Sequence, residues 1–477
     1  MKFYPTIGIE VHAEMATKSK MFCSCKNDPH EKNPNTNICP ICMAHPGALP
    51  VPNKEAILNM VKVGLAFDGS SISEDFSEFD RKNYFYPDIP KGYQISQYKF
   101  PFVVGGEFAG FPITRVHLEE DTATSKHDRG DYSLIDFNRA GVPLMELVTE
   151  ANTYEDFETA ASSTSHFAKE LQLLLRYLGV SNANMEKGEM RVEANISVSP
   201  DKDKWGTKVE VKNLNSFKSV EKAILFELNR MKKMYEEGTE GNIVQETRGW
   251  DENKQSTFSQ RSKENAQDYR YFPDPDLPKM RLKDVFDMKD IKSTLPETPQ
   301  EKRERFKKTY KIKEEDIESY IYDFELCGFF EGVCNLLEKE EEYKIASNLI
   351  TSDFVGVRKS DPEANMPNKD NFAELVKMFS EDKITSRVAK DILAMMTKED
   401  ISPMDYAKDN NLLQSNNQEE LIPIIEKIIS ENTQAVESYK SGKENAIMAL
   451  VGQVMKATNG KANPKIALEL LKEHASK

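Results

Sequence analysis

The chain has 477 residues, of which 39% are hydrophobic and 30% are charged, and its formal net charge is −15. This length corresponds to roughly two to four domains, and the lack of any run of about 18 apolar residues argues against a membrane span. So acidic a chain is not expected to bind nucleic acid over its whole surface, because phosphate affinity comes from Lys and Arg.

The N-terminal segment 6–15, TIGIEVHAEM, alternates between apolar and polar residues and predicts a β-strand. Its apolar face comprises Ile7, Ile9, Val11 and Ala13, and its polar face comprises Gly8, Glu10, His12 and Glu14. Because this N-terminus lacks the apolar core of a signal peptide, we expect a cytoplasmic protein. Thiols stay reduced in the cytosol, which argues against disulfides.

Four of the six cysteines lie within twenty residues, namely Cys23, Cys25, Cys39 and Cys42. In a reducing compartment such a cluster predicts thiolate ligands for Zn²⁺, and the last two have the C-x-x-C spacing of a zinc knuckle. Four thiolates would close the coordination shell, so the zinc should be structural. The alternative is a set of thiols packed in a core, as we expect for Cys327 and Cys334.

Strands and helices continue to alternate up to about residue 290. Helices are expected over 53–67, 154–179 and 219–238, the first with Asn53 as its N-cap. Strands are expected over 113–124, 191–198 and 206–214. Interleaved strands and helices without strict βαβ repetition predict an α+β fold.

Acidic residues recur on several of these strands. In the HLEED stretch, His117, Glu119 and Asp121 share one face and Glu120 lies on the other, and later strands carry Glu193 and Glu210. Carboxylates that converge on a sheet face repel one another unless cations lie between them. Oxygen-rich sites with one imidazole suit Mg²⁺ or Mn²⁺ held with substrate phosphates. The alternative is a solvated strand face. No G-x-x-x-x-G-K-[ST] motif occurs, so an ATP site would not be a P-loop.

Two stretches are rich in aromatic residues. Residues 79–98, FDRKNYFYPDIPKGYQISQY, interleave cations with aromatic rings, a pattern typical of surfaces on which the bases of single-stranded RNA stack. A loop packed by its own rings explains the pattern equally well. Residues 261–278, RSKENAQDYRYFPDPDLP, contain three prolines and predict an extended connector.

The pattern becomes helical near Leu295. Thr298 as N-cap, Pro299 at the first helical position and Glu301 at the third predict a helix start. We therefore divide the chain into an α+β domain over 1–294, a helical domain over 295–405 and a helical tail domain over 406–477.

The end of the tail is basic, with five lysines against two glutamates from Val451 onward. Lys456, Lys461 and Lys465 fall around a turn between two expected helices, where lysines can reach a phosphate backbone. The alternative is an ordinary solvated surface.

Together, long motifs from near residue 3 to near residue 466 resemble one family, the GatB subunits of bacterial aspartyl/glutamyl-tRNA amidotransferases. They include IGIEVHAEM, NTNICPICMAHPGALPVPN, HLEEDTATSKH, DFNRAGVPLMELVTE, EVKNLNSFKSVEKAI and LVGQVMKATNGKANP. The resemblance implies a cradle-like catalytic domain of glutamine synthetase-like fold, then an all-α helical domain and a small tail domain, which we expect to bind tRNA.

The resemblance also implies an activity. With ATP and Mg²⁺, the chain would phosphorylate the side-chain carboxylate of Glu or Asp misacylated on a tRNA, and ammonia would then displace the phosphate. A carboxylate needs this activation because its own leaving group would be oxide. No amidase-like stretch with a serine nucleophile is visible, so ammonia should come from another polypeptide. The family implies that this partner is a glutaminase subunit of the amidotransferase, and that a small third subunit ties the two large ones together.

The family's catalytic and magnesium-site residues map onto Glu10, His12, Glu120 and Glu210, and Glu119 and Glu193 complete the expected cofactor-binding set. The family usually has Asp at position 193 and Pro at position 151, where this chain has Glu and Ala. Some members lack the cysteines, which agrees with a structural role for zinc.

A zinc-stabilised tRNA-binding scaffold without catalysis of its own is the alternative from a different class. Magnesium-dependent ATP hydrolysis stimulated by misacylated tRNA would separate the two. The sequence does not decide between Asp-tRNA and Glu-tRNA, because that choice depends on which synthetases misacylate in the cell.

Overall fold

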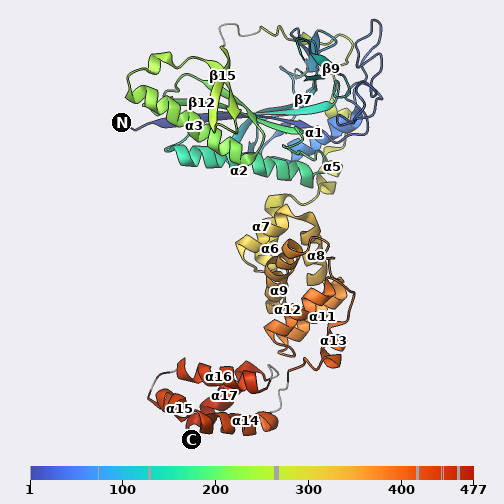
Figure 1. The fold of residues 1–477 in the computed structure, drawn as a ribbon. Coiled ribbons are helices and arrows are strands. Elements are labelled where there is room, and N and C mark those ends of the chain that lie inside the picture. Colours follow the sequence, from blue (N-terminus) through green and yellow to red (C-terminus); the bar gives the residue numbers. More distant parts are fainter. Residues whose placement is uncertain are drawn as a thin grey trace. The chain divides into compact units, whose positions relative to one another are not determined.

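One large β-sheet organises the first part of the chain, and helices make up the second (Figure 1). The computed structural model describes residues 2–73, 75–126, 130–262, 268–414, 418–441, 443, 445–458 and 462–476. The chain divides into two units, Met1–Pro299 and Gln300–Lys477.

The strands all belong to the first unit. They are β1 (Tyr4–Glu14), β2 (Ser71–Ile72), β3 (Asp80–Asn83), β4 (Tyr93–Ser96), β5 (Val103–Val104), β6 (Glu107–Phe108), β7 (Phe111–Glu120), β8 (Thr124–Lys126), β9 (Leu134–Asp136), β10 (Pro143–Thr149), β11 (Asn152–Thr153), β12 (Met190–Ser199), β13 (Val209–Leu214), β14 (Glu246–Asp251), β15 (Ser256–Ser262) and β16 (Phe272–Pro273).

Strand β1 lies near the middle of the main sheet, which has eleven strands within the described residues. The order is β15-β14-β13-β12-β1-β10-β7-β5-β2, with β11 paired to β1 and β6 paired to β7. Neighbouring strands are antiparallel except β13 and β14, which are parallel. Two smaller sheets have the orders β16-β3-β4 and β8-β9.

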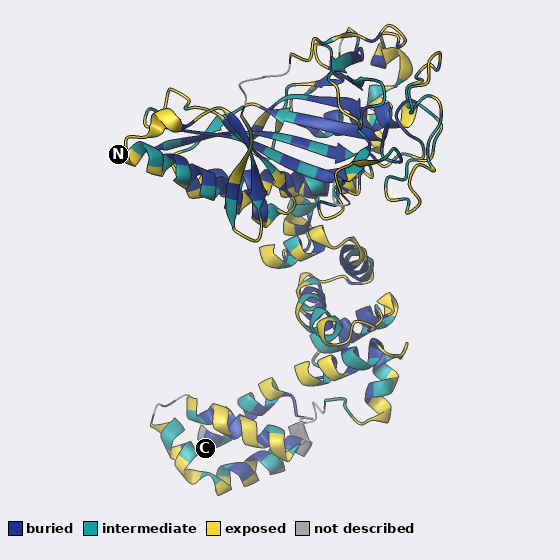
Figure 2. Ribbon diagram, turned by 45° about the horizontal axis from the view of Figure 1, so that its top comes forward, coloured by how far each residue is buried: buried dark blue, intermediate teal, exposed yellow. Residues whose placement is uncertain are grey.

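The alternation predicted for the first strand is confirmed in β1. Ile7, Ile9, Val11 and Ala13 are buried, whereas Glu10, His12 and Glu14 are half-buried. Side chains of a strand point alternately to its two faces, so the sheet has an apolar face and a polar face at this strand. The apolar side chains join the core of the first unit (Figure 2).

Helices α2 (Phe157–Tyr177) and α3 (Phe217–Glu236) cover the apolar face. Asp156 caps α2 by accepting a hydrogen bond from Thr159 N, and Ser216 caps α3 by accepting one from Ser219 N. Because Ser216 is the cap, α3 begins earlier than the predicted Ser219. Each fully buried leucine on these helices stabilises the fold by roughly 1.5–3 kcal/mol.

The strand predicted over 113–124 is wrong at its end, because β7 stops at Glu120. The Asp121 side chain accepts a hydrogen bond from Thr122 N at 2.8 Å, and such a local bond turns the chain. The remaining helical elements of the first unit are α1 (Lys54–Ala66), η1 (Glu240–Asn242), α4 (Leu282–Val285) and α5 (Met288–Thr294).

The second unit is helical throughout its described residues. Its elements are α6 (Pro299–Thr309), α7 (Glu314–Tyr322), α8 (Phe324–Cys334), α9 (Glu340–Asn348), η3 (Leu349–Phe354), α10 (Val355–Ser360), α11 (Lys369–Ser380), α12 (Ser386–Met396), α13 (Pro403–Asp409), α14 (Gln418–Glu431), α15 (Thr433–Lys440), α16 (Asn445–Ala457) and α17 (Pro464–Ser476). The helix predicted to start at Pro299 is confirmed as α6. Helices α14 to α17 share a core of their own, which includes Leu421, Leu450 and Leu471.

The fold is therefore mixed α/β in its first unit and α-helical in its second. The glutamine synthetase-like cradle and the division into domains over 1–294, 295–405 and 406–477 remain predictions. None of the helices in the described ranges is long and apolar enough to cross a membrane.

Candidate active site

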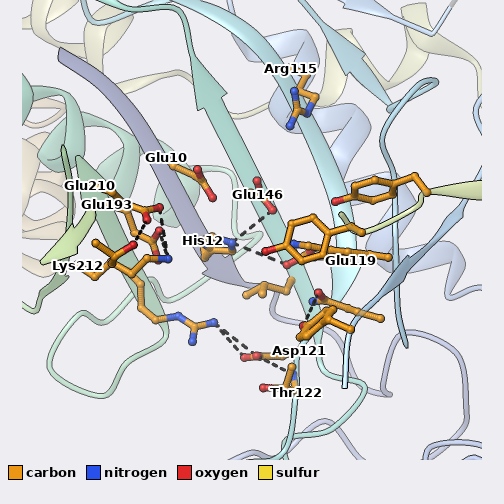
Figure 3. Close-up of a pocket in the computed structure, with 18 of the residues that line it drawn as sticks. Glu10, His12, Arg115, Glu119, Asp121, Thr122, Glu146, Glu193, Glu210 and Lys212 are labelled. Carbon is orange, nitrogen blue, oxygen red and sulfur yellow. Dashed lines mark hydrogen bonds and ion pairs between the residues drawn. The ribbon is translucent and has the colours of Figure 1, made fainter. Parts of the chain in front are cut away.

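A cavity of about 580 Å³ lies on the polar face of the main sheet. Its acidic and imidazole lining comes from strands β1, β7, β10, β12 and β13, and comprises Glu10, His12, Glu119, Asp121, Glu146, Glu193 and Glu210. Figure 3 shows these side chains converging from neighbouring strands. Of the predicted site residues, the structure thus brings together Glu10, His12, Glu119, Glu193 and Glu210.

Glu146 lies between two histidines across three adjacent strands. It is the register partner of His12 on β1 and of His117 on β7. Its Oε2 lies 3.4 Å from His12 Nε2 and 3.2 Å from His117 Nε2. Glu119 Oε1 lies 3.8 Å from His12 Nε2, so a second carboxylate faces the same imidazole.

A second acidic group lies on the other side of β1. Glu10 is the register partner of Glu193 on β12, and Glu210 on β13 lies close to both. Lys212 Nζ lies 2.7 Å from Glu193 and 3.5 Å from Glu210. Thr247 donates a hydrogen bond of 2.6 Å to Glu210. One lysine therefore serves three carboxylates.

Burial and mutual repulsion perturb the pKa values of these groups. Burial, with the charges of Glu146 and Glu193, raises the pKa of Glu10 to about 7. Burial alone would lower the pKa of His12, but the hydrogen bond and charge of Glu146 raise it to about 9. Burial would raise the pKa of Glu146, but the neighbouring imidazoles lower it well below its ordinary range. Strongly shifted groups that line a cavity are typical of functional sites.

The donor set suits a divalent cation. Three overlapping sets of side chains place one possible ligand atom each within 4.8 Å of one another: Glu10, His12 and Glu146; His117, Glu119 and Glu146; and Glu10, Glu193 and Glu210. In the described part of the chain, buried Glu119 Oε2 and His117 Nδ1 have no hydrogen-bond partner. Carboxylate oxygens with one or two imidazoles are ligands that Mg²⁺ and Mn²⁺ accept, and His12 must release its proton to act as one.

Lys82 forms a cationic wall of the same cavity. Its Nζ lies 3.9 Å from Glu119 Oε2 and 5.3 Å from the centre of the Tyr269 ring. Tyr84 and Tyr271 also line the cavity. Burial alone would lower the pKa of Lys82, but Glu119 and Glu146 raise it well above its ordinary value, so the ammonium stays charged.

The two aromatic-rich stretches meet at this wall. Strand β16 pairs with β3, where Phe272 faces Arg81, and Arg81 Nε donates to Asp274 at 2.8 Å. Tyr98 stacks on Tyr271 with ring centres 4.6 Å apart. The stretches therefore pack partly on their own rings, while the exposed Phe85 and Tyr86 leave apolar surface free. Both predicted roles of residues 79–98 stay open.

Glu120 lies apart from the other predicted metal-site residues. Its side chain accepts hydrogen bonds from Lys91 Nζ at 2.7 Å and from Ile95 N at 3.0 Å. Glu119 and Glu120 are adjacent on β7, so their side chains point to opposite faces. The structure thus places Glu119 in the cavity and Glu120 behind it, in agreement with the alternation of the HLEED stretch but not with the mapping from the family.

The four clustered cysteines converge in an irregular loop region. Their sulfur atoms lie within 4.8 Å of one another, so Cys23, Cys25, Cys39 and Cys42 could hold a metal. A hydrogen bond from the Cys23 thiol lowers the pKa of Cys42 to about 5, whereas burial and other thiols raise the pKa of Cys25 to about 11. A tetrahedral set of four sulfur atoms is a donor set for Zn²⁺. Cys327 and Cys334 are buried in α8, as predicted.

The structure does not gather the predicted tail lysines into one group. Lys456 lies in the last turn of α16, and Lys465 in the first turn of α17 pairs with Asp382 at 3.2 Å. Lys461 lies outside the described residues.

Sequence reasoning missed Glu146, Lys82 and Lys212 as members of the cavity. Each carried a signal. Glu146 is the single charged residue in the apolar stretch PLMELV, and Lys212 alternates with Glu210 along one strand. Lys82 belongs to the aromatic-rich stretch, but only the pairing of β3 with β4 and β16 brings it over the sheet face.

A sheet face that gathers carboxylates, an imidazole and a caged lysine defines a cation-dependent enzyme acting on anionic substrates. Two family models match the chain, described as the GatB/GatE catalytic domain over residues 5–287 and the GatB domain over residues 329–474. The chain therefore belongs to the GatB family of amidotransferase subunits, and the resemblance inferred from its motifs is confirmed.

Several bacteria have similar proteins, which are named as the corresponding subunits of aspartyl/glutamyl-tRNA(Asn/Gln) amidotransferases. That of Persephonella marina is 41% identical over 485 residues, covering 99% of both chains. Those of Thermoanaerobacter pseudethanolicus and Clostridium beijerinckii are 42% and 41% identical, covering 100% of both chains. The likeness thus extends over the full length of this chain.

Proposed function

We propose that this chain is the kinase and transamidase subunit of a tRNA-dependent amidotransferase. Its substrates would be Glu on tRNA(Gln), Asp on tRNA(Asn), or both. The observation that carries the proposal is the convergence of His12, Glu119 and Glu146 with Glu10, Glu193 and Glu210 on one cavity beside Lys82.

The reaction has two steps that balance. An oxygen of the substrate side-chain carboxylate attacks the γ-phosphorus of ATP, and ADP leaves. Ammonia then attacks the acyl carbon, the C–O bond to phosphate breaks, and inorganic phosphate leaves with the new amide in place. Phosphoryl transfer of this kind depends on positioning and on neutralising charge more than on covalent catalysis by the protein.

The cavity residues have distinct roles in this scheme. Glu10, His12, Glu119, Glu146, Glu193 and Glu210 would hold Mg²⁺, which supplies the positive charge that draws the phosphate oxygens and the carboxylate together. Lys82 is held near Glu119 by three tyrosines and can pair with a phosphate oxygen. The rings of Tyr84, Tyr269 and Tyr271 exclude water from one side, which protects an acyl phosphate from hydrolysis.

The remaining parts of the chain would serve assembly and substrate binding. The four cysteines would hold one structural Zn²⁺, and the lysines at Lys456, Lys461 and Lys465 would contact the tRNA backbone. The relatives are each named as one subunit of an amidotransferase, which supports a multi-subunit assembly. We infer that a glutaminase subunit supplies the ammonia and that a small third subunit joins the two.

A phosphorylation assay tests the proposal. The assembled complex, with Mg²⁺ and ATP, should form ADP when Glu-tRNA(Gln) or Asp-tRNA(Asn) is added, and should form amidated tRNA when ammonia follows. Glu146→Gln should lower the turnover number by about 100-fold or more with tRNA affinity nearly unchanged, because Glu146 orients two imidazoles.

Glu186→Gln is the matched control, since Glu186 is an exposed glutamate outside the cavity. It should keep normal turnover. A chain that binds misacylated tRNA but never converts ATP to ADP would instead be a zinc-stabilised scaffold, and the proposed function would be rejected.

A further inference from the structure

Lys20 is a fully buried lysine beside the cysteine cluster. Its side chain is among the largest in the chain to have essentially no exposed surface. The ammonium donates to the carbonyl oxygen of Asn37 at 2.7 Å, to that of Phe137 at 3.2 Å, and to Cys42 Sγ at 3.9 Å. All three of its N–H groups are thereby used.

A buried ammonium is costly unless an anion lies beside it. In the described part of the chain, no carboxylate lies within ion-pair distance of Lys20 Nζ, and two of its three acceptors are neutral carbonyls. The remaining acceptor is the sulfur of Cys42, which carries negative charge when it is a thiolate bound to a metal. A divalent metal held by four thiolates has a net charge of −2, so it requires positive charge nearby.

We propose that Lys20 is the charge-balancing and positioning residue of the cysteine metal site. Its ammonium neutralises part of the negative charge of a thiolate-bound divalent metal, and its two carbonyl contacts fix the loop that carries Cys39 and Cys42. Partners that lie just outside the ligands of a metal commonly set its affinity. The inference rests on the proposed metal at the four cysteines.

The same contacts join the cysteine loop to the segment 137–141. Lys20 holds the Phe137 carbonyl, and the fully buried Asn138 accepts hydrogen bonds from Thr36 N and Asn37 N, both at 2.8 Å. Met21 N donates to Gly141 O at 2.7 Å. The metal loop therefore rests on this segment through three consecutive attachments.

The segment 137–141 continues to the floor of the active-site cavity. Arg139 donates to Thr122 O at 3.0 Å, and its Nε lies 3.6 Å from Asp121 Oδ2. Gly141 N donates to Asp121 O at 2.9 Å. Asp121 and Thr122 line the cavity, so Lys20 also links the metal loop to the cavity floor.

The test measures metal affinity, which does not depend on the amidotransferase reaction. The full chain, purified with zinc, is titrated against a chromophoric chelator, in wild type, Lys20→Met and Lys20→Arg. Lys20→Met keeps the length and removes the charge, and should weaken zinc binding by roughly 10- to 100-fold. Lys20→Arg keeps the charge and should retain more of the affinity.

Lys26→Met is the matched control, because Lys26 lies in the same loop region but is exposed and pairs with Asp28. Its zinc affinity should equal that of wild type. If folded Lys20→Met binds zinc as tightly as wild type, Lys20 only fills space and the inference is overturned. If wild type itself binds no zinc, the proposed metal site fails instead, which is a different result.

A second measurement covers the case in which Lys20→Met does not fold. When zinc is removed from wild type with a chelator, amide hydrogen exchange should quicken in residues 137–141, which contain no cysteine. Unchanged exchange there would show that the segment is independent of the metal loop, and would overturn the inference.

Discussion

Glu10 and Glu193 lie directly opposite each other on the paired strands β1 and β12, and both carboxylates face the same cavity. Like charges opposite each other in a sheet are destabilising, and Lys212 at 2.7 Å from Glu193 offsets only part of this repulsion. The raised pKa of Glu10, about 7, reflects burial and the neighbouring carboxylates. A pair arranged in this way gains stability when a cation binds.

Removing one charge of this pair should therefore have opposite effects with and without a cation. In chelator, Glu10→Gln should be more stable than wild type by roughly 0.5–1 kcal/mol, because a like-charge contact is lost. In millimolar Mg²⁺, wild type should gain stability and Glu10→Gln should gain much less. Thermal unfolding of both proteins in each condition measures the two changes.

Glu186→Gln, an exposed change, should leave both curves as in wild type. An equal Mg²⁺-induced rise in Tm for wild type and Glu10→Gln would show that Glu10 is not a cation ligand.

The pKa of His12 should depend on Glu146. In the metal-free protein the hydrogen bond and charge of Glu146 raise the pKa of His12 to about 9 against the opposing effect of burial. Glu146→Gln removes the charge, so burial should prevail and the pKa should fall toward or below the ordinary value for histidine. NMR titration of the imidazole signals measures the change, with the more exposed His30, paired with Glu189, as an internal reference. A His12 signal that titrates as in wild type would rule out this account of the pair.

Local sequence patterns predicted much of this arrangement. The alternation of β1 placed Glu10 and His12 on one face, and the HLEED alternation separated Glu119 from Glu120, as the structure shows. Helix caps at Asn53 and Thr298–Pro299 located helix starts because capping depends on a few adjacent residues. Cysteine spacing located the cluster for the same reason.

Long-range pairing was the part that the sequence could not supply. Glu146 faces His12 only because β10 is the neighbour of β1, although the two residues are far apart in the chain. Lys82 reaches the cavity only through the small sheet that joins β3 to β16. No local period encodes which strands become neighbours, so these residues were found from the structure and not from the pattern.

Stability should fall with rising pH through the titration of Glu14. Burial, then the charge of Asp121, raises the pKa of Glu14 to about 7 against the effects of Arg139 and Arg191. A carboxyl group whose native pKa is raised contributes stability that is fully present below its unfolded pKa, near 4.5. That contribution is lost as pH rises toward 7.

Glu14→Gln cannot titrate, so wild type minus variant should decrease by on the order of 1–2 kcal/mol between about pH 4.5 and pH 7. Denaturant unfolding across this range measures the difference. A difference that stays constant or grows with pH would contradict the assignment.

Asp274 should be a strong anchor of the segment that carries Tyr269 and Tyr271. Its side chain is fully buried and accepts a 2.8 Å hydrogen bond from Arg81. Asp274→Asn leaves a buried guanidinium poorly compensated, so the free energy of unfolding should fall by about 2–4 kcal/mol. The more exposed Asp276 contacts the same arginine at 3.1 Å, and Asp276→Asn should cost less than about 1 kcal/mol. Equal losses in the two variants would show that burial of the ion pair does not decide its strength.

Removing the tail helices should weaken tRNA binding without unfolding the rest of the chain. Helices α14 to α17 form a core of their own, and α13 (Pro403–Asp409) packs on α11 (Lys369–Ser380), so a cut after Gln414 preserves that contact. The truncated chain in its complex should have a higher KM for tRNA and a flatter dependence of affinity on salt, because fewer counterions are released from phosphates. Its turnover number at saturating tRNA should be nearly unchanged, since the cavity residues all lie in the first unit.

The paired change Lys456→Ala with Lys465→Ala in the full chain separates charge from shape. If phosphate contacts carry the binding, this variant should reproduce part of the loss of affinity and reduce the salt slope by about one to two. Lys427→Ala, an exposed lysine on α14 beside Glu431, is the matched control and should change neither value. Should the truncated chain keep both the affinity and the salt slope of the full chain, the tail has no part in binding RNA, and the basic residues after Val451 are an ordinary solvated surface.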